Sequence, residues 1–191
     1  MHIPIVLASD NSITELPLKD ALLIKPREFR DMRGVFFKLY TSKLLASYGV
    51  RFDVAEDYLT YSEKGVLRGL HCQDEPFSQA KLVTCLRGRI FDAIVDMRRS
   101  SPTFGKWCSV ILEGGKPDTL YVPKGFSHGN LSMEDGTIVT YKADNPYSSE
   151  HEHGILWSDP GLKISWPDVG HVSVSEKDKK LPCLKDAKYF K

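Results

Sequence analysis

Short runs rich in apolar and β-branched residues, each closed by turn residues, fill the middle of the chain. They cover Lys81–Arg87, Arg89–Asp96, Trp107–Leu112, Thr119–Val122 and Gly136–Lys142. Glycine or proline follows closely after most of them, and the second run alternates partly at a period of two residues. Strand-length runs at this spacing, rather than alternating strands and helices, predict an all-β domain of the double-sheet jelly-roll or cupin kind.

Two of the turns between these runs are typical of hairpins. The segment Cys85–Asp96 has Gly88 at its middle, and a turn containing glycine and proline joins Trp107–Leu112 to Thr119–Val122. A tight turn between two strand-length runs favours antiparallel pairing of the runs that flank it. The sequence therefore predicts two hairpins, one centred on Gly88 and one on the turn after Leu112.

The pattern along the chain indicates one domain, residues 1–191, in three parts. An N-terminal arm and helix occupy about residues 1–50, with the clearest helix signal at about Thr41 to Tyr48, before Gly49. The jelly-roll core is expected over 51–150. Residues 151–191 hold few strand signals and are expected to wrap the outside of the barrel or close one mouth, with short peripheral helices.

Composition and charge narrow the classes of partner. Lys and Arg number 26 and Asp and Glu 25, a net charge of +1, so any anionic ligand must be held by locally placed cations rather than by a global basic field. The four cysteines form no C-x-x-C pair, which is typical of a reducing compartment. Since no signal-peptide pattern or membrane-length apolar run stands out, we expect a cytoplasmic protein with no membrane or nucleic-acid partner.

The densest group of chemically competent residues lies between positions 62 and 83. It contains Arg68, Gly69, His71 and Lys81. In a regular strand Arg68 and His71 point to opposite faces, but a bulge at Gly69 would turn both toward one cavity. His71 is then a natural general base, and Arg68 and Lys81 can hold a diphosphate or a developing oxyanion. Taken singly, each is more simply explained as a solvated charge or a satisfied core histidine.

A second histidine, His128, follows a turn rich in proline and glycine and raises the question of a metal. A metal-binding cupin would offer a His-x-His pair, but Gln73 stands where the second histidine of that pair would be. Glu75 lies in a polar turn without a partner histidine. Because zinc and iron sites need three or four ligands, His71 and His128 alone fall short, and we predict no metal.

Two tyrosines and one polar segment complete the candidates. Tyr141 lies at the end of a predicted strand, and Tyr147 follows a turn. A buried phenol can donate a proton, although an aromatic residue at a strand end more often serves packing. Ser175–Asp178 by itself looks like any polar helix start.

Taken together and in order, these motifs resemble those of the dTDP-4-dehydrorhamnose 3,5-epimerase family of nucleotide-sugar epimerases. The likeness spans nearly the whole chain, and although each piece is weak alone, the ordered set is specific. The segments that carry it are Phe29–Phe36, Gly65–His71, Asp96–Gly105, Pro123–Gly129, Tyr141-Lys142, Ile155–Pro160, Ile164–Pro167 and Ser175–Asp178.

This resemblance implies a cupin jelly roll that needs neither metal nor cofactor, takes a nucleotide sugar as substrate and serves deoxysugar biosynthesis. It also implies a homodimer in which Phe29 and Arg33 reach the neighbouring subunit's site. His128 and Tyr147 would line the substrate pocket.

The resemblance further implies a role for each reacting residue. His71 would be the base, oriented by Asp178, and Tyr141 would be the acid on the opposite face of the sugar. Lys81 would lie near the C4 oxygen and Arg68 on the diphosphate. These residue types suit the reaction, because a C4 ketone acidifies the hydrogens on C3 and C5, and inversion then needs a base on one face and an acid on the other.

The chain departs from the family pattern at several positions. Glu56 and Tyr58 stand where members specific for dTDP show Gln-x-Asn, Lys38 replaces a Glu, Cys72 an aromatic residue and Asn130 a Phe. Several of these positions, together with Gln73, are expected to line the nucleotide and sugar pocket. The residues for chemistry are thus intact while those for recognition are altered, so we hypothesise a changed base or sugar.

Three functions fit these observations. The first is an epimerase acting at C3 and C5 or at C3 alone. The second is a 3,4-ketoisomerase on the same scaffold, which uses similar proton transfers. The third is a non-catalytic sugar-binding cupin, which has no need of a His–Asp dyad opposite a tyrosine. The complete set of His71, Asp178 and Tyr141 favours the epimerase.

Overall fold

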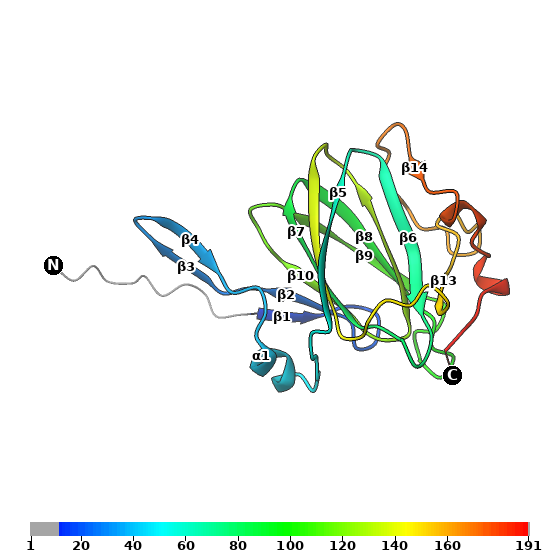
Figure 1. The fold of residues 1–191 in the computed structure, drawn as a ribbon, viewed down its shortest axis with the longest axis horizontal. Helices are drawn as coiled ribbons and strands as arrows, with labels where there is room; N and C mark the ends of the chain where they lie inside the picture. The colour runs from blue at the N-terminus through cyan, green and yellow to red at the C-terminus, as the bar shows by residue number, and fades with distance from the viewer. Residues whose placement is uncertain (1–11, 191) are drawn as a thin grey trace.

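The computed structural model describes residues 12–190 and consists mainly of two antiparallel sheets that face each other (Figure 1). The first sheet has the strand order β1 (Ser12–Glu15), β2 (Leu22–Lys25), β10 (Thr119–Val122), β7 (Lys81–Arg87), β12 (Thr137–Ala143), β5 (Glu56–Ser62). The second has the order β13 (Glu152–Gly154), β6 (Val66–Gln73), β11 (Phe126–Ser132), β8 (Arg89–Asp96), β9 (Trp107–Glu113). The predicted all-β, double-sheet fold is confirmed.

Most of the predicted elements have the expected bounds. Strands β7, β8 and β10 begin and end as predicted, β9 is one residue longer, and β12 is shifted by one residue. The predicted helix is α1, Ser42–Ser47, with Thr41 and Tyr48 as its flanking residues. Two short 3-10 helices, η1 (Asp178–Lys180) and η2 (Leu184–Asp186), lie near the C-terminus.

Both predicted hairpins are wrong, because each turn carries the chain from one sheet to the other. Strand β7 pairs with β10 and β12, whereas β8 pairs with β9 and β11, and β9 and β10 likewise lie in different sheets. The two turns pack together at one corner: the amide of Gly114 donates to the carbonyl of Gly88 at 2.8 Å. A turn sequence indicates a reversal but does not say which strand becomes the partner.

Hydrophobic side chains fill the space between the sheets and also cover the outer face of the second sheet. Ile90 and Ile94 of β8 belong to the inner core, while Phe91, Ala93 and Val95 of the same strand belong to a second cluster. Alternate residues of a strand point to opposite faces. The second cluster is completed by residues of the C-terminal segment, including tryptophans 157 and 166. Both faces of β8 are therefore buried, which explains its nearly continuous hydrophobic sequence.

The C-terminal segment is tied to the barrel by backbone pairing as well as by packing. Strand β14 (Ser173–Val174) pairs in parallel with the start of β6, with Ser173 opposite Val66. Strand β13 pairs antiparallel with the end of β6, with Gly154 opposite His71. Two short strands of the C-terminal segment, β13 and β14, therefore lie beside the strand that carries His71.

A separate hairpin projects away from the barrel near the N-terminal end (Figure 1). It is formed by β3 (Glu28–Asp31) and β4 (Gly34–Phe37), which, within residues 12–190, pair only with each other. Its apolar side chains are exposed: Met32 is 86% and Phe36 60% accessible. Apolar surface of this kind is typical of a segment that contacts another molecule. In residues 12–190, none of the helices has the length and apolar character needed to cross a membrane.

Candidate active site

An extra residue in β6 aims two predicted site residues into the same hollow. Where β6 pairs with β11, His71 lies opposite His128 and Arg68 opposite Asn130, so three steps along β6 match two along β11. The bulge contains Gly69, which has φ +115° and lies so close to β11 that a Cβ atom would be 2.6 Å from Gly129 Cα. Only glycine fits there. The predicted bulge is confirmed, and Arg68 and His71 line one cavity.

Two adjoining cavities contain most of the predicted site residues. One, here called the Tyr141 cavity, has a volume of about 520 Å³; the other, the Tyr147 cavity, has about 610 Å³. Tyr58, His71 and Lys81 line both. The Tyr141 cavity is lined further by Arg68, His128, Asn130, Tyr141, Lys177 and Asp178. The Tyr147 cavity is lined further by Glu56, Asp57, Cys72, Gln73, Gln79, Tyr147 and Glu152.

His71 and Asp178 form a close pair in the Tyr141 cavity. Nε2 of His71 lies 2.7 Å from Oδ1 of Asp178, and the second carboxylate oxygen accepts the amide of Gly69 at 3.2 Å. Burial raises the pKa of Asp178, but its contacts with His71, together with hydrogen bonds from Gly69 and Ser175, outweigh burial and leave the pKa below the ordinary value. The carboxylate therefore fixes the orientation of the ring and leaves Nδ1 as the ring nitrogen available for proton transfer.

Tyr141 enters the same cavity from the opposite sheet. It lies on β12, whereas His71 lies on β6, and its side chain is buried. The ring stacks on Tyr58 of β5 with centroids 5.0 Å apart and an interplanar angle of 11°. Burial and the negative charge of Asp92 raise the pKa of Tyr141. The phenol therefore keeps its proton at neutral pH and is available as a proton donor.

A second histidine–aspartate pair lies behind this cavity. Nε2 of His128 is 2.6 Å from Oδ1 of Asp92, and both side chains are buried. The His128 ring also meets Tyr141 edge to face, with centroids 6.2 Å apart. Sequence reasoning missed Asp92, since nothing in a run of apolar residues marks one aspartate as the partner of a histidine 36 residues away.

Lys81 lies where both cavities meet. It is the first residue of β7 and pairs across the sheet with Val122 and Ala143. Burial lowers the pKa of Lys81, although nearby negative groups oppose this. A partly desolvated ammonium group is a strong partner for an oxyanion.

Glu152 joins residues around both cavities and was missed by sequence reasoning. Its Oε2 accepts the hydroxyl of Tyr147 at 2.7 Å and forms an ion pair with Lys177, while Oε1 lies 3.8 Å from Nδ1 of His71. Burial raises the pKa of Glu152, but these hydrogen bonds outweigh it and leave the pKa lowered. The signal was hidden because β13, which pairs beside His71, is only three residues long.

Other predicted binding residues line the Tyr147 cavity and also form hydrogen bonds with the backbone of the loops that surround it. The side-chain nitrogen of Gln73 donates hydrogen bonds to the backbone carbonyls of Phe77 and Pro146. Its side-chain oxygen accepts a hydrogen bond from the backbone amide of Ser148. Glu56 accepts the backbone amide of Tyr147 at 2.9 Å. Much of the hydrogen-bonding capacity of Gln73 is thus used by the loop that carries Tyr147.

Cys72 lies in the same wall, where the family pattern has an aromatic residue. Its sulfur accepts the hydroxyl of Ser127 at 3.3 Å and lies 3.3 Å from Nδ1 of His153. Burial raises the pKa of the Cys72 thiol to about 11. The thiol is therefore protonated at neutral pH and contributes shape rather than charge.

Three predicted binding residues are not brought to either cavity within one chain. Phe29 and Arg33 belong to the projecting hairpin, and Lys38 directly follows it. Arg33 pairs with Asp31 of its own turn. Among residues 12–190 there is also no group of three His, Cys, Asp or Glu side chains arranged to hold a metal ion.

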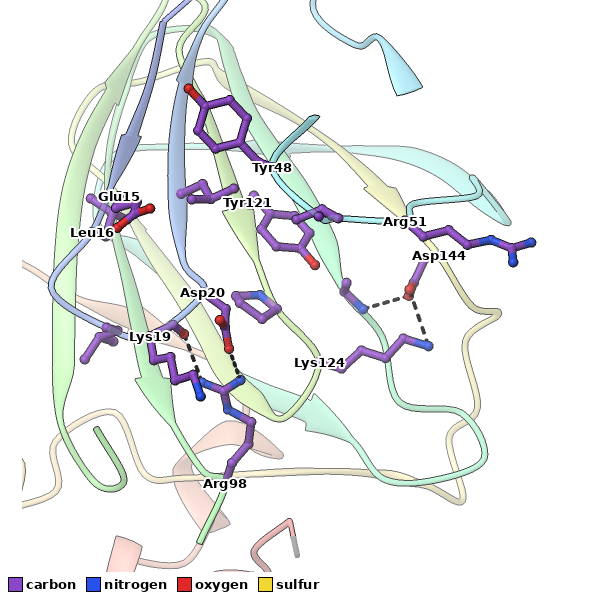
Figure 2. A pocket seen from close by; sticks show the side chains of 16 residues that line it. Glu15, Leu16, Lys19, Asp20, Tyr48, Arg51, Arg98, Tyr121, Lys124 and Asp144 are labelled. Carbon is purple, nitrogen blue, oxygen red and sulfur yellow. Dashed lines mark hydrogen bonds and ion pairs between the residues drawn. The ribbon is translucent and has the colours of Figure 1, made fainter. Parts of the chain in front are cut away.

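A further hollow, of about 580 Å³, lies on another part of the molecule (Figure 2). Two of its cations are held by carboxylates: Arg98 donates to Asp20 at 2.8 Å, and Lys124 lies 3.3 Å from Asp144. Within the described residues it shares no lining residue with the Tyr141 and Tyr147 cavities. We therefore assign its ion pairs to the structure of the barrel rather than to the candidate site.

Comparison with known proteins decides the family. The family model for dTDP-4-dehydrorhamnose 3,5-epimerase matches residues 15–186. The chain belongs to the dTDP-4-dehydrorhamnose 3,5-epimerase family. The enzyme of that name from Shigella flexneri is 43% identical over 178 residues, which cover 93% of this chain and 97% of the relative. The predicted resemblance, and with it the prediction of a cupin-type epimerase, is confirmed.

Solved structures of this epimerase family agree with the fold throughout its length. The dTDP-4-dehydrorhamnose 3,5-epimerase from Elizabethkingia anophelis superposes with a TM-score of 0.90 at 38% identity, covering 94% of this chain and 99% of that one. A 3'-monoepimerase from Streptomyces bikiniensis, in complex with dTDP-quinovose, gives a TM-score of 0.84 at 32% identity over 89% of this chain and 86% of that one. Similarity thus extends to enzymes that invert two carbons and to one that inverts one.

Proposed function

We propose that this chain inverts C3, C5 or both in a nucleotide-linked 4-keto sugar, with His71 as base and Tyr141 as acid. The observation that carries the proposal is that the two side chains enter one cavity from opposite sheets. A sugar ring between them has one face toward an imidazole and the other toward a phenol. That is the arrangement that inversion through a planar enolate needs.

Proton removal is assigned to Nδ1 of His71. The C4 ketone lets the electron pair of the broken C–H bond delocalise into an enolate, and the imidazole takes the proton. Asp178 supports this step because its carboxylate, 2.7 Å from Nε2, stabilises the imidazolium. Lys81, at the junction of the two cavities, stabilises the charge on the C4 oxygen.

Proton return is assigned to Tyr141. Its O–H delivers a proton to the opposite face of the enolate, and the electron pair of the enolate forms the new C–H bond. The phenolate then regains a proton from solvent, while His71 releases its own. Neither a redox cofactor nor a metal enters this sequence of steps.

The remaining predicted residues are assigned to substrate binding. Arg68 holds the diphosphate beside the Tyr141 cavity, where His128 also faces the sugar. Glu56, Tyr58, Gln73 and Tyr147 line the Tyr147 cavity and serve the nucleotide. Since Glu56, Tyr58 and Cys72 depart from the family pattern there, we propose that the base or sugar recognised differs from that of the dTDP-specific relatives.

The projecting hairpin supports a homodimer. Phe29 packs on Phe36 with centroids 5.8 Å apart, and the hairpin exposes apolar side chains away from its own barrel. We assign Phe29, Arg33 and Lys38 to the cavities of the neighbouring subunit. The four cysteines are free thiols, which supports the cytoplasm as the location.

The test is solvent deuterium uptake followed by NMR. The protein is incubated with dTDP-4-keto-6-deoxyglucose and its UDP, GDP and CDP counterparts in heavy water. Deuterium at C3, C5 or both, with inverted configuration, is the expected result for at least one substrate. A carbonyl moved to C3 would indicate a ketoisomerase, and no label in any sugar would contradict the proposed activity.

A pair of histidine variants makes this test specific. His71→Asn should lower uptake by about a thousandfold, because the base is lost. His171→Asn changes an exposed histidine and should leave uptake as in the wild type. Wild-type uptake in His71→Asn would remove His71 from its assigned role.

A further inference from the structure

Asn130 makes a direct contact with the hydroxyl of Tyr141. Its side-chain amide donates to the phenol oxygen at 2.7 Å, and both residues are buried. Asn130 lies on β11, opposite Arg68 of β6 on one side and Asp92 of β8 on the other. Because the phenol oxygen accepts this hydrogen bond, its own hydrogen points away from Asn130 and is free to turn into the cavity that both residues line.

Most of the surroundings disfavour a phenolate at this position. Burial raises the pKa of Tyr141, and the buried carboxylate of Asp92 raises it further. The Tyr58 ring stacked on Tyr141 fixes the ring plane but offers no charge. Thr60 and Asn130 act in the opposite direction, because hydrogen bonding to the phenol oxygen favours the phenolate and lowers the pKa of Tyr141. A proton donor with so high a pKa gives up its proton slowly unless the product of the transfer is stabilised.

We propose that Asn130 is a positioning residue that acts through Tyr141: it directs the phenol hydrogen at the sugar and stabilises the phenolate formed when that hydrogen is delivered. This inference rests on the proposed function and assigns Asn130 to the proton-return half of the reaction. In this step one proton moves from the Tyr141 oxygen to the enolate carbon. The oxygen keeps the electron pair of the broken O–H bond and becomes a phenolate. Proton removal by His71 does not involve Asn130.

Comparing deuterium in recovered substrate with the amount of inverted product separates proton return from proton removal. When return from Tyr141 is slow, the enolate is reprotonated by His71 on its original face after exchange with solvent. The substrate recovered from heavy water then carries deuterium without inversion. In Asn130→Leu, which keeps the approximate shape but removes the donor, we expect inversion to fall roughly ten- to a hundredfold. The ratio of deuterium in recovered substrate to inverted product should rise, with KM little changed.

Three further variants separate the loss of the donor from a folding defect. Asn130→Ala cannot overpack the site and should raise the same ratio, with the cooperative melting transition retained. Asn130→Asp replaces the donor by a carboxylate and should lower inversion more than Asn130→Leu does. Ser132→Ala alters a buried residue two positions along the same strand face and should leave the ratio at the wild-type value.

A double-variant comparison tests whether Asn130 works through Tyr141. In a Tyr141→Phe background, adding Asn130→Leu should change nothing further, because the group it acts on is already gone. An equal loss in both backgrounds, or a proportional fall of exchange and inversion in Asn130→Leu, would overturn the inference. If the wild type itself exchanged no proton with any 4-keto substrate, the proposed function would fail instead, so the two failures are distinguishable.

Discussion

Oδ1 of Asp178 lies 2.7 Å from Nε2 of His71, although 107 residues separate them in the sequence. The contact exists because β14 pairs with the start of β6 and η1 follows directly after it. The C-terminal segment therefore does more than cover the second sheet. It delivers the carboxylate that orients the imidazole.

Replacing Asp178 by Asn should abolish most of the activity while leaving the fold intact. The amide keeps the shape but cannot stabilise an imidazolium, so we expect a loss of about a thousandfold in deuterium uptake. Glu176→Gln changes an exposed neighbour that pairs with Lys179, and it should retain wild-type uptake. Equal activity in the two variants would contradict the assignment of Asp178.

Stability should fall on acidification because of Asp96. This buried carboxylate accepts hydrogen bonds from Arg98, Ser101 and Thr103. Burial raises the pKa of Asp96, but these bonds outweigh it and hold the pKa below its unfolded value. A group with a depressed folded pKa contributes stability above the unfolded pKa and loses it as the pH falls through the folded one. The melting temperature should therefore drop below about pH 4.

The variant Asp96→Asn tests whether Asp96 causes this loss of stability at low pH. It should cost about 3 kcal/mol at neutral pH, because Arg98, Ser101 and Thr103 lose a buried carboxylate acceptor and Arg98 keeps only Asp20 as an ionic partner. Its melting temperature should then change less with pH between 5 and 2 than that of the wild type. A parallel decline in both proteins would show that other carboxylates govern acid unfolding.

Glu152 should affect substrate binding more than the chemical step. Glu152→Gln removes the negative charge that holds Lys177 and replaces the carboxylate that accepts the Tyr147 hydroxyl by a weaker, neutral amide acceptor. Since both partners line the cavities, we expect KM to rise about three- to tenfold and kcat to change less. Glu150→Gln, at an exposed position two residues earlier, should change neither constant. A fall in kcat at constant KM would instead assign Glu152 to proton transfer from His71.

The sequence was sufficient where a residue type and its motif identify the chemistry. The bulge at Gly69, the bounds of the strands β7, β8 and β10, and the presence of His71 and Tyr141 in one cavity could all be predicted, because each depends on local pattern or on a recognisable motif. Partnerships across the sheets could not. Asp92 and Asn130 are opposite each other in the pairing of β8 with β11, and that register is set by the packed core rather than by either segment alone.

The same reason explains the two wrong hairpins. Gly88 marks a reversal of the chain, but the direction of that reversal depends on how the corner packs. A Cβ atom on Gly88 would lie 2.4 Å from Oγ1 of Thr137, a residue of a strand far along the chain. Long-range contacts of this kind override the local preference for pairing between neighbouring strands.

Nucleotide preference should change when two departures from the family pattern are reversed. Glu56 lines the Tyr147 cavity and holds the Tyr147 amide, and Tyr58 stacks on Tyr141. The double variant Glu56→Gln, Tyr58→Asn removes a negative charge and an aromatic ring from the walls, so binding of dTDP should strengthen relative to UDP, GDP and CDP. Calorimetric titration of wild type and variant with the four diphosphates measures this, with Glu134→Gln at an exposed position as control. Should the wild type already prefer dTDP clearly, and the variant keep the same order, these two residues would not set the choice of nucleotide.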